Sequence, residues 1–194
     1  MNTNKDEKVK TVASNRLNTG DLALVALFAA VMAVCSWITV PAAVPFTLQT
    51  MGVFLAVGLL RGKRGTISVL VYLFLGAIGL PVFSGFAGGL GYMMGATGGY
   101  IIGFLFSALI MWFMEKVFGR DMKILILSMV LGLILCYAFG TAWFMTVYSG
   151  SNGPIDLATA LGWCVFPFII PDAIKIAVAC LLIRRLRPAI HIDD

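Results

Sequence analysis

Long apolar runs separated by short polar turns are the feature of this sequence that most limits its fold. The last run extends from Leu157 to Ile183, which exceeds the roughly 20 residues that an apolar helix needs to cross a bilayer. The 194-residue chain is 60% hydrophobic and 12% charged, whereas a soluble domain has about 25% charged residues. Because a helix satisfies its own backbone hydrogen bonds in lipid, we expect an all-α integral membrane protein.

The polar breaks divide the apolar sequence into six expected transmembrane helices. These are residues 22–40, 47–60, 65–79, 97–118, 124–148 and 157–183. They form one membrane domain, residues 22–187, between a polar N-terminal tail, residues 1–21, and a short C-terminal tail, residues 188–194. An even number of spans places both termini on one side of the membrane.

Positive charge predicts which side that is. Every lysine and arginine except Lys175 falls in the N-terminal tail, in or beside the turns after the second and fourth spans, or after the sixth span. Since positive residues mark the cytoplasmic side, we expect both termini to be cytoplasmic. The basic residues form no stripe with interleaved aromatic residues, so nucleic-acid binding is not indicated.

The last apolar run is interrupted by Pro167 and Pro171, and an acid and a base follow. A charge in hydrocarbon costs from about 3 to more than 10 kcal/mol on different scales, and Asp172 and Lys175 are spaced to share one face of a helix. Each proline also frees a backbone carbonyl. We therefore expect a kinked last helix that forms one wall of a polar pocket open to the outside. The alternatives are a purely structural ion pair and a kink that only helps helix packing.

Two connections contain further groups suited to a small ligand. Residues 44–50 lead into the second span with polar side chains that either cap the helix or bind a ligand. Residues 76–92 are rich in glycine, which allows backbone to approach a ligand closely, and their aromatic rings suit the walls of a site for a small organic molecule. The alternative for this second segment is a loop packed on the bundle. The candidates are Thr47, Gln49, Phe83, Gly89 and Tyr92.

Several classes of function lack the residues that they need. The four cysteines form no CxxC pair, which argues against a metal site or a disulfide. The only histidine, His191, lies in the C-terminal tail, and no nucleophile–base pair is evident, so we do not expect an enzyme. Residues 58–64 have the wrong spacing for a phosphate-binding loop, and we expect neither a nucleotide site nor another cofactor.

Four motifs, in order along the chain, resemble the BioY family. They are VPFTLQT at residues 44–50, GAIGLPVF at 76–83, TGGY at 97–100 and PFIIPDAIK at 167–175. BioY proteins are the substrate-binding membrane subunits, or S-components, of energy-coupling-factor (ECF) biotin transporters. The resemblance covers about residues 22–187. It implies a multi-pass protein of a prokaryotic plasma membrane that takes biotin from the outside and docks on a transmembrane coupling protein driven by two cytoplasmic ATPases.

The resemblance also suggests roles for particular residues. Asp172 or the freed carbonyls can accept hydrogen bonds from the ureido N–H groups of biotin, and Lys175 can pair with its carboxylate or hold Asp172 in place. Which group meets which end of biotin stays open. The other candidate ligand residues are Gln49, Thr47 and Tyr92 as hydrogen-bonding groups, Phe46, Phe83 and Trp163 as walls, and Gly89.

Small residues on the first span are candidates for contact with the coupling protein. Ala26 and Ala30 are four residues apart, a spacing that lets two membrane helices approach closely. The spacing alone slightly favours contact inside the bundle, but its match to the surface that S-components present to their partner favours the contact between proteins. The alternative function is a self-sufficient secondary carrier that uses Asp172 as a proton-coupling acid, although no inverted repeat of the usual kind is evident.

Overall fold

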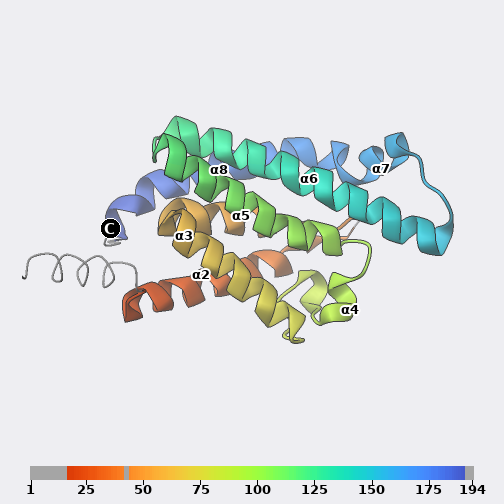
Figure 1. Ribbon diagram of the computed structural model, residues 1–194, viewed down its shortest axis with the longest axis horizontal. Helices are drawn as coiled ribbons and strands as arrows, with labels where there is room; N and C mark the ends of the chain where they lie inside the picture. The colour runs from red at the N-terminus through yellow and green to blue at the C-terminus, as the bar shows by residue number, and fades with distance from the viewer. Residues whose placement is uncertain (1–16, 42–43, 191–194) are drawn as a thin grey trace, which may run out of the picture.

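The computed structural model describes residues 17–41 and 44–190, and helices make up most of this part of the chain. Figure 1 shows the long helices lying side by side in an elongated bundle. The predicted helical class is therefore confirmed. The longer helices are α2 (Thr19–Trp37), α3 (Gln49–Ala77), α5 (Gly98–Phe118), α6 (Met122–Asn152) and α8 (Ile169–Leu186). The shorter elements are β1 (Thr39–Val40), β2 (Phe46–Thr47), η1 (Ser84–Phe86), α4 (Leu90–Met93), α7 (Leu157–Cys164), η2 (Phe166–Phe168) and η3 (Arg187–Ala189).

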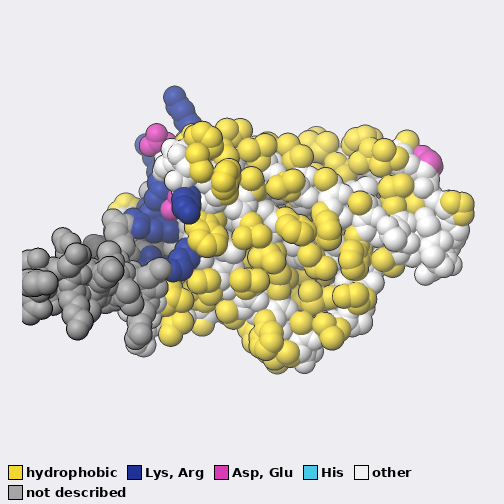
Figure 2. All heavy atoms as spheres, viewed as in Figure 1, with side chains coloured by type: hydrophobic (Ala, Val, Ile, Leu, Met, Phe, Trp, Pro, Cys, Tyr) yellow, Lys and Arg dark blue, Asp and Glu magenta, His cyan; other side chains and the backbone are white. Residues whose placement is uncertain are grey.

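Within residues 17–41 and 44–190, four helical segments are long and apolar enough to cross a bilayer. They are Thr19–Trp37, Gly98–Phe118, Met122–Asn152 and Leu157–Ala189. The face of the bundle in Figure 2 is largely apolar, and the lysine and arginine side chains on it gather at one end, where α2 begins and α8 ends (Figure 1). This is the surface expected of a bundle with lipid around its middle and headgroups at its basic end.

Helix α3 folds back on itself at Arg61. The backbone there has φ 70° and ψ 161°, outside the helical region, and a Cβ added to Gly65 would lie 2.4 Å from the Val57 Cα. The Nε2 atom of Gln49 lies 2.6 Å from the hydroxyl of Tyr72, 23 residues further on, a separation of about 35 Å in a straight helix. The turn predicted between residues 60 and 65 is therefore present, although neither half of α3 is among the four long apolar spans.

Some predicted helix ends were wrong. The first helix stops at Trp37 rather than Val40, because β1 pairs with β2 in an antiparallel ladder. This pairing places Thr47 in a strand instead of at the start of a helix. Helix α6 continues to Asn152 through residues expected to form a loop, and it ends where Gly153 takes φ 89°, a conformation that glycine adopts without strain.

The predicted kink before the last helix is confirmed, with one break rather than two. Helix α7 ends at Cys164, residues 166–168 form η2 around Pro167, and α8 begins at Ile169. Pro171 lies in the first turn of α8, where its missing N–H would have no helical partner. Asp156 caps the start of α7, and hydrogen bonds from the Thr159 hydroxyl and N–H hold the pKa of its carboxyl below the usual value.

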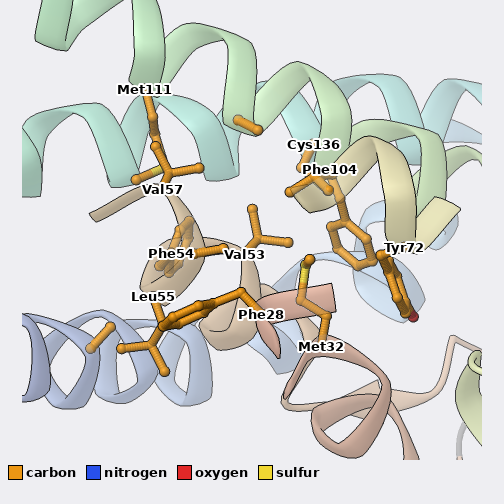
Figure 3. Close-up of a cluster of buried hydrophobic side chains, with 14 of the residues drawn as sticks. Phe28, Met32, Val53, Phe54, Leu55, Val57, Tyr72, Phe104, Met111 and Cys136 are labelled. Carbon is orange, nitrogen blue, oxygen red and sulfur yellow. The ribbon is translucent and has the colours of Figure 1, made fainter. Parts of the chain in front are cut away.

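The core lies where α2, α3, α5 and α6 meet. Figure 3 shows buried side chains from these four helices packed together, among them Met32, Phe54, Phe104 and Cys136. Helices α5 and α6 approach closely because α6 offers glycine at the contacts: a Cβ at position 132 would lie 2.4 Å from the Ser107 Oγ. Small residues at such contacts are typical of packed membrane helices. This packing fixes α6 against the rest of the bundle.

Candidate ligand-binding site

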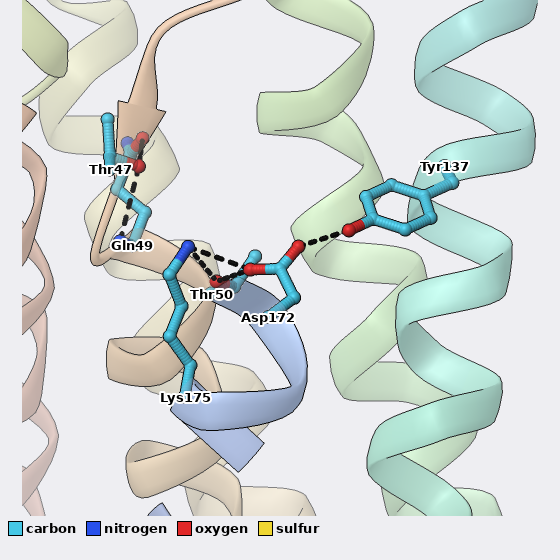
Figure 4. A network of polar contacts seen from close by, with 6 residues as sticks. All are labelled: Thr47, Gln49, Thr50, Tyr137, Asp172 and Lys175. Carbon is cyan, nitrogen blue, oxygen red and sulfur yellow. Dashed lines mark hydrogen bonds and ion pairs between the residues drawn. The ribbon is translucent and has the colours of Figure 1, made fainter. Parts of the chain in front are cut away.

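Asp172 and Lys175 form a buried ion pair at the start of α8. The Lys175 Nζ lies 2.7 Å from the Asp172 Oδ1, and the two side chains are 6% and 3% exposed, respectively. The hydroxyl of Thr50, on α3, lies 3.2 Å from the same carboxylate oxygen and 3.3 Å from the Nζ. Tyr137, on α6, donates a hydrogen bond to the other oxygen, Oδ2. Figure 4 shows these side chains converging from three helices. Both carboxylate oxygens are therefore engaged, which offsets part of the desolvation of the pair.

An aromatic ring supports the lysine from the other side. The Nζ of Lys175 lies 4.1 Å from the centroid of the Phe46 ring, a distance at which the ring face attracts a cation. Phe46 in turn stacks on Phe168, with ring centroids 6.1 Å apart. Phe168, in the segment before α8, thus supports the ring that contacts the ammonium group.

A cavity lies between the ion pair and the connections that precede α3 and α5. Its empty volume is about 590 Å³, including space open to solvent. One charged pair, several hydroxyl groups and aromatic walls are the features expected of a site for a small organic ligand. The polar residues that line it are Thr47, Gln49, Thr50, Ser84, Tyr92, Thr97, Tyr100, Tyr137, Asp172 and Lys175, and the apolar ones include Val44, Ile101, Phe104 and Phe168.

Gln49 belongs to a second polar chain at the cavity wall. The Thr47 hydroxyl donates to the Gln49 Oε1 at 2.9 Å, and the Gln49 Nε2 donates to the Tyr72 hydroxyl at 2.6 Å. Tyr72 then donates to the backbone carbonyl of Val82 at 3.0 Å. The Thr47 hydroxyl also accepts from the Gln49 backbone N–H at 3.3 Å. Thr47 therefore accepts from the first N–H of α3 and lines the cavity at the same time.

The structure brings some of the predicted ligand residues to this cavity and leaves others away from it. Asp172, Lys175, Gln49, Thr47 and Tyr92 all line it. Phe46 contributes through its contact with the ammonium group of Lys175 rather than as a wall of the cavity.

The remaining predicted residues do not line the cavity. Phe83 is fully buried behind Tyr92, with ring centroids 5.7 Å apart. Gly89 has φ 92°, and its N–H bonds to the Gly76 carbonyl at 2.7 Å, so it closes the glycine-rich connection. Trp163 is 43% exposed, and its ring meets that of Tyr148 edge to face, with centroids 5.8 Å apart. The loop-packing alternative therefore describes Phe83 and Gly89 better than a role as ligand contacts.

Comparison with known proteins agrees with the resemblance seen in the sequence. The sequence model of the BioY family matches residues 7–192, nearly the whole chain. The chain belongs to the BioY family.

The similarity to individual BioY proteins extends over most of each chain. The chain is 40% identical over 168 residues to the probable biotin transporter BioY of Pyrococcus horikoshii, covering 86% of this chain and 96% of the relative. It is 37% identical over 162 residues to the biotin transporter BioY of Thermotoga maritima, covering 83% and 92%. Its fold is similar to a crystal structure of the S-component for biotin from an ECF-type ABC transporter, with a TM-score of 0.78 and 32% identity over 89% of this chain and 95% of that one.

Two residues that contact Asp172 were missed as ligand candidates. Tyr137 lies inside an apolar run, and its contact with Asp172 depends on how α6 crosses α8, which no local pattern reveals. Thr50 directly follows Gln49. It is a third polar side chain at the start of an apolar span, and that pattern indicates a ligand role for it as much as for Thr47 and Gln49.

The exposed face of α2 in this BioY family member contains the predicted docking residues. Ala26 and Ala30 are exposed, whereas Ala29 and Ala33 are buried against the bundle. The internal contact is therefore made by the second pair of alanines, and the first pair is left at the surface. In the part of the chain that the structure describes, no group of three or more His, Cys, Asp or Glu side chains is placed to hold a metal ion.

Proposed function

We propose that this chain is the biotin-binding membrane subunit of an ECF transporter. The observation that carries the proposal is a buried Asp172–Lys175 pair at the wall of a cavity in a bundle of the BioY family. A buried pair stabilises a fold little by itself, so its position beside a cavity is better explained by a charged ligand. The relatives described above are themselves biotin transporters by name.

The chemistry of the cavity supports binding the two ends of biotin by different groups of residues. Biotin has a carboxylate at one end and a ureido ring with N–H donors at the other. Among the described residues that line the cavity, Lys175 is the cation that can meet the carboxylate, and pairing between ionised groups gives stronger hydrogen bonds than pairing between neutral ones. The Gln49 and Thr47 side is then left for the ureido ring, and Tyr100 and Phe104 are walls for the apolar part of biotin.

The same proposal includes the arrangement of the chain in the membrane. The two halves of α3 complete six spans together with the four long apolar segments, and both termini are cytoplasmic in the plasma membrane of a prokaryote. The basic side chains at one end of the bundle support this orientation (Figure 2). The connections that line the cavity come after α2 and after α3, at the end of the bundle away from the basic side chains (Figure 1). This position favours an opening to the outside.

A transport assay in liposomes tests the proposed function. The chain alone should bind biotin in titration calorimetry but should not accumulate it, with or without a proton gradient. Accumulation should require a transmembrane coupling protein, two ATPase subunits and ATP, because the subunit has no enzymatic step of its own. Biotin amide, which lacks the carboxylate, should bind about 100-fold more weakly. Gradient-driven uptake by the chain alone would instead support a self-sufficient carrier with Asp172 as its proton-coupling acid.

Bulky residues on the exposed face of α2 should separate docking from binding. We expect Ala26→Trp and Ala30→Trp to prevent co-purification with the coupling protein, because a large side chain keeps two helices from approaching closely. Biotin affinity of the isolated subunit should stay within about twofold, since both positions face away from the cavity. Ala177→Trp, on the exposed face of α8, is the control. Co-purification of all three variants at the level of the unchanged protein would place the docking surface elsewhere.

Tyr137 should contribute to biotin affinity through Asp172. Tyr137→Phe removes the hydrogen bond to Oδ2 and leaves a buried carboxylate oxygen without that donor, so we expect about tenfold weaker binding in titration calorimetry. Tyr148→Phe on the same helix is the matched control, because its ring stacks on Phe144 outside the cavity. Equal affinity in the two variants would show that the Tyr137 hydroxyl does not hold the carboxylate for the ligand.

A further inference from the structure

The hydrogen bonds around Tyr72 determine which way the Gln49 amide points. The backbone carbonyl of Val82 can only accept, so the single hydroxyl proton of Tyr72 is directed to it, at 3.0 Å. The Tyr72 oxygen can therefore only accept from Gln49, and only the nitrogen end of an amide can donate. The Gln49 Nε2 accordingly faces Tyr72, at 2.6 Å.

The other end of the amide is held beside the cavity. The Thr47 hydroxyl donates to the Gln49 Oε1 at 2.9 Å. Thr47 and Gln49 both line the cavity, whereas Tyr72 does not and is 1% exposed. The nitrogen end thus faces the protein interior, and the oxygen end lies next to a group of the cavity wall. An oxygen has two lone pairs, and Thr47 uses one of them.

Tyr72 is itself fixed by packing. Its ring meets the fully buried Phe83 edge to face, with centroids 5.6 Å apart. Phe83 is a candidate ligand residue that the structure places away from the cavity, and this contact accounts for its position. The connection after α3 therefore supports the polar chain from behind: Phe83 holds the Tyr72 ring, and Val82 takes the Tyr72 proton.

We propose that Tyr72 is a positioning residue that holds the Gln49 amide with its oxygen toward the cavity, so that the site selects ligands with an N–H donor at this point. The proposal rests on the proposed function, in which the donor is a ureido N–H of biotin. Without the Tyr72 hydroxyl the amide can turn over and present N–H groups to the ligand's own N–H. A ligand that lacks an N–H group at this point would leave the Gln49 oxygen without a hydrogen bond. Binding sites that hydrogen-bond a substrate N–H reject analogues without that group strongly.

A double-mutant cycle measured by titration calorimetry tests this role. Tyr72→Phe and Gln49→Ala should each weaken biotin binding about tenfold, and the double variant should bind within about twofold of Gln49→Ala alone, because Tyr72 acts only through Gln49. Ser68→Ala is the matched control: it removes another buried hydrogen bond of α3, to the Val25 carbonyl at 2.8 Å and away from the cavity, and should leave the affinity within about twofold. Independent losses that multiply in the double variant, or unchanged binding by Tyr72→Phe, would overturn the proposal.

A further variant tests the orientation without changing Tyr72. Gln49→Glu keeps an oxygen on the cavity side whichever way the group turns, so it should bind biotin about tenfold more tightly than Gln49→Ala. Equal weakening in the two variants would overturn the proposal even if Tyr72→Phe did not fold. Failure of the unchanged protein to bind biotin would instead overturn the proposed function, and this inference with it.

Discussion

Replacing Lys175 by methionine is expected to weaken biotin binding by about 100-fold or more and to destabilise the protein. The variant leaves the Asp172 carboxylate, which is 3% exposed, without its cation in the interior of the bundle. Breaking a buried pair by removing one partner costs about 3–5 kcal/mol, and the proposed cation for the biotin carboxylate is lost as well. Thermal unfolding in detergent and titration calorimetry measure the two effects.

Replacing Asp172 as well as Lys175 separates the effect on stability from the effect on binding. In the double variant Asp172→Asn, Lys175→Met no uncompensated charge remains, so the unfolding midpoint should recover most of its loss. Biotin binding should not recover, because the cation is still absent. A double variant that binds biotin as well as the unchanged protein would mean that the two side chains only neutralise each other. In that case the buried pair would no longer support the proposed function.

Adding a single methyl group at Gly65 is expected to destabilise the bundle by about 3 kcal/mol, the upper end of the usual range for overpacking. The new Cβ would lie 2.4 Å from the Val57 Cα and 2.8 Å from the Ala56 carbonyl oxygen. Both are backbone atoms, which cannot move aside without separating the two halves of α3. Because Gln49 and Thr50 lie on the first half and Tyr72 on the second, biotin binding should fall together with stability.

Gly162→Ala is the matched control for this change. It adds the same methyl group inside α7, where, apart from the adjoining residues and the helix's own backbone, no atom lies within 4 Å of the new Cβ. Alanine is a better helix former than glycine by about 1 kcal/mol, so this variant should be at least as stable as the unchanged protein. Size-exclusion profiles and unfolding midpoints compare the two. A Gly65→Ala variant as stable as Gly162→Ala would contradict the close contact at the turn of α3.

Much of this protein could be predicted from local sequence. The apolar runs determine the helical class, because backbone in lipid has to satisfy its own hydrogen bonds. The interruption at Pro167 and the spacing of Asp172 and Lys175 are local as well: the first follows from a missing N–H, and the second from the period of a helix. The structure confirms the kink and shows the two charges paired on one side of α8.

The surroundings of the ion pair were decided by tertiary structure alone. Tyr137 meets Asp172 from another helix, and Phe46 lies over the ammonium group of Lys175 from a short strand. Phe83, which looked suited to a cavity wall, is buried behind Tyr92 instead. A sequence pattern gives the face of a helix on which a side chain lies, because that depends on the period of the helix. Which other helix that face meets depends on packing between residues far apart in the chain, such as the contacts of α6 with α5 and α8.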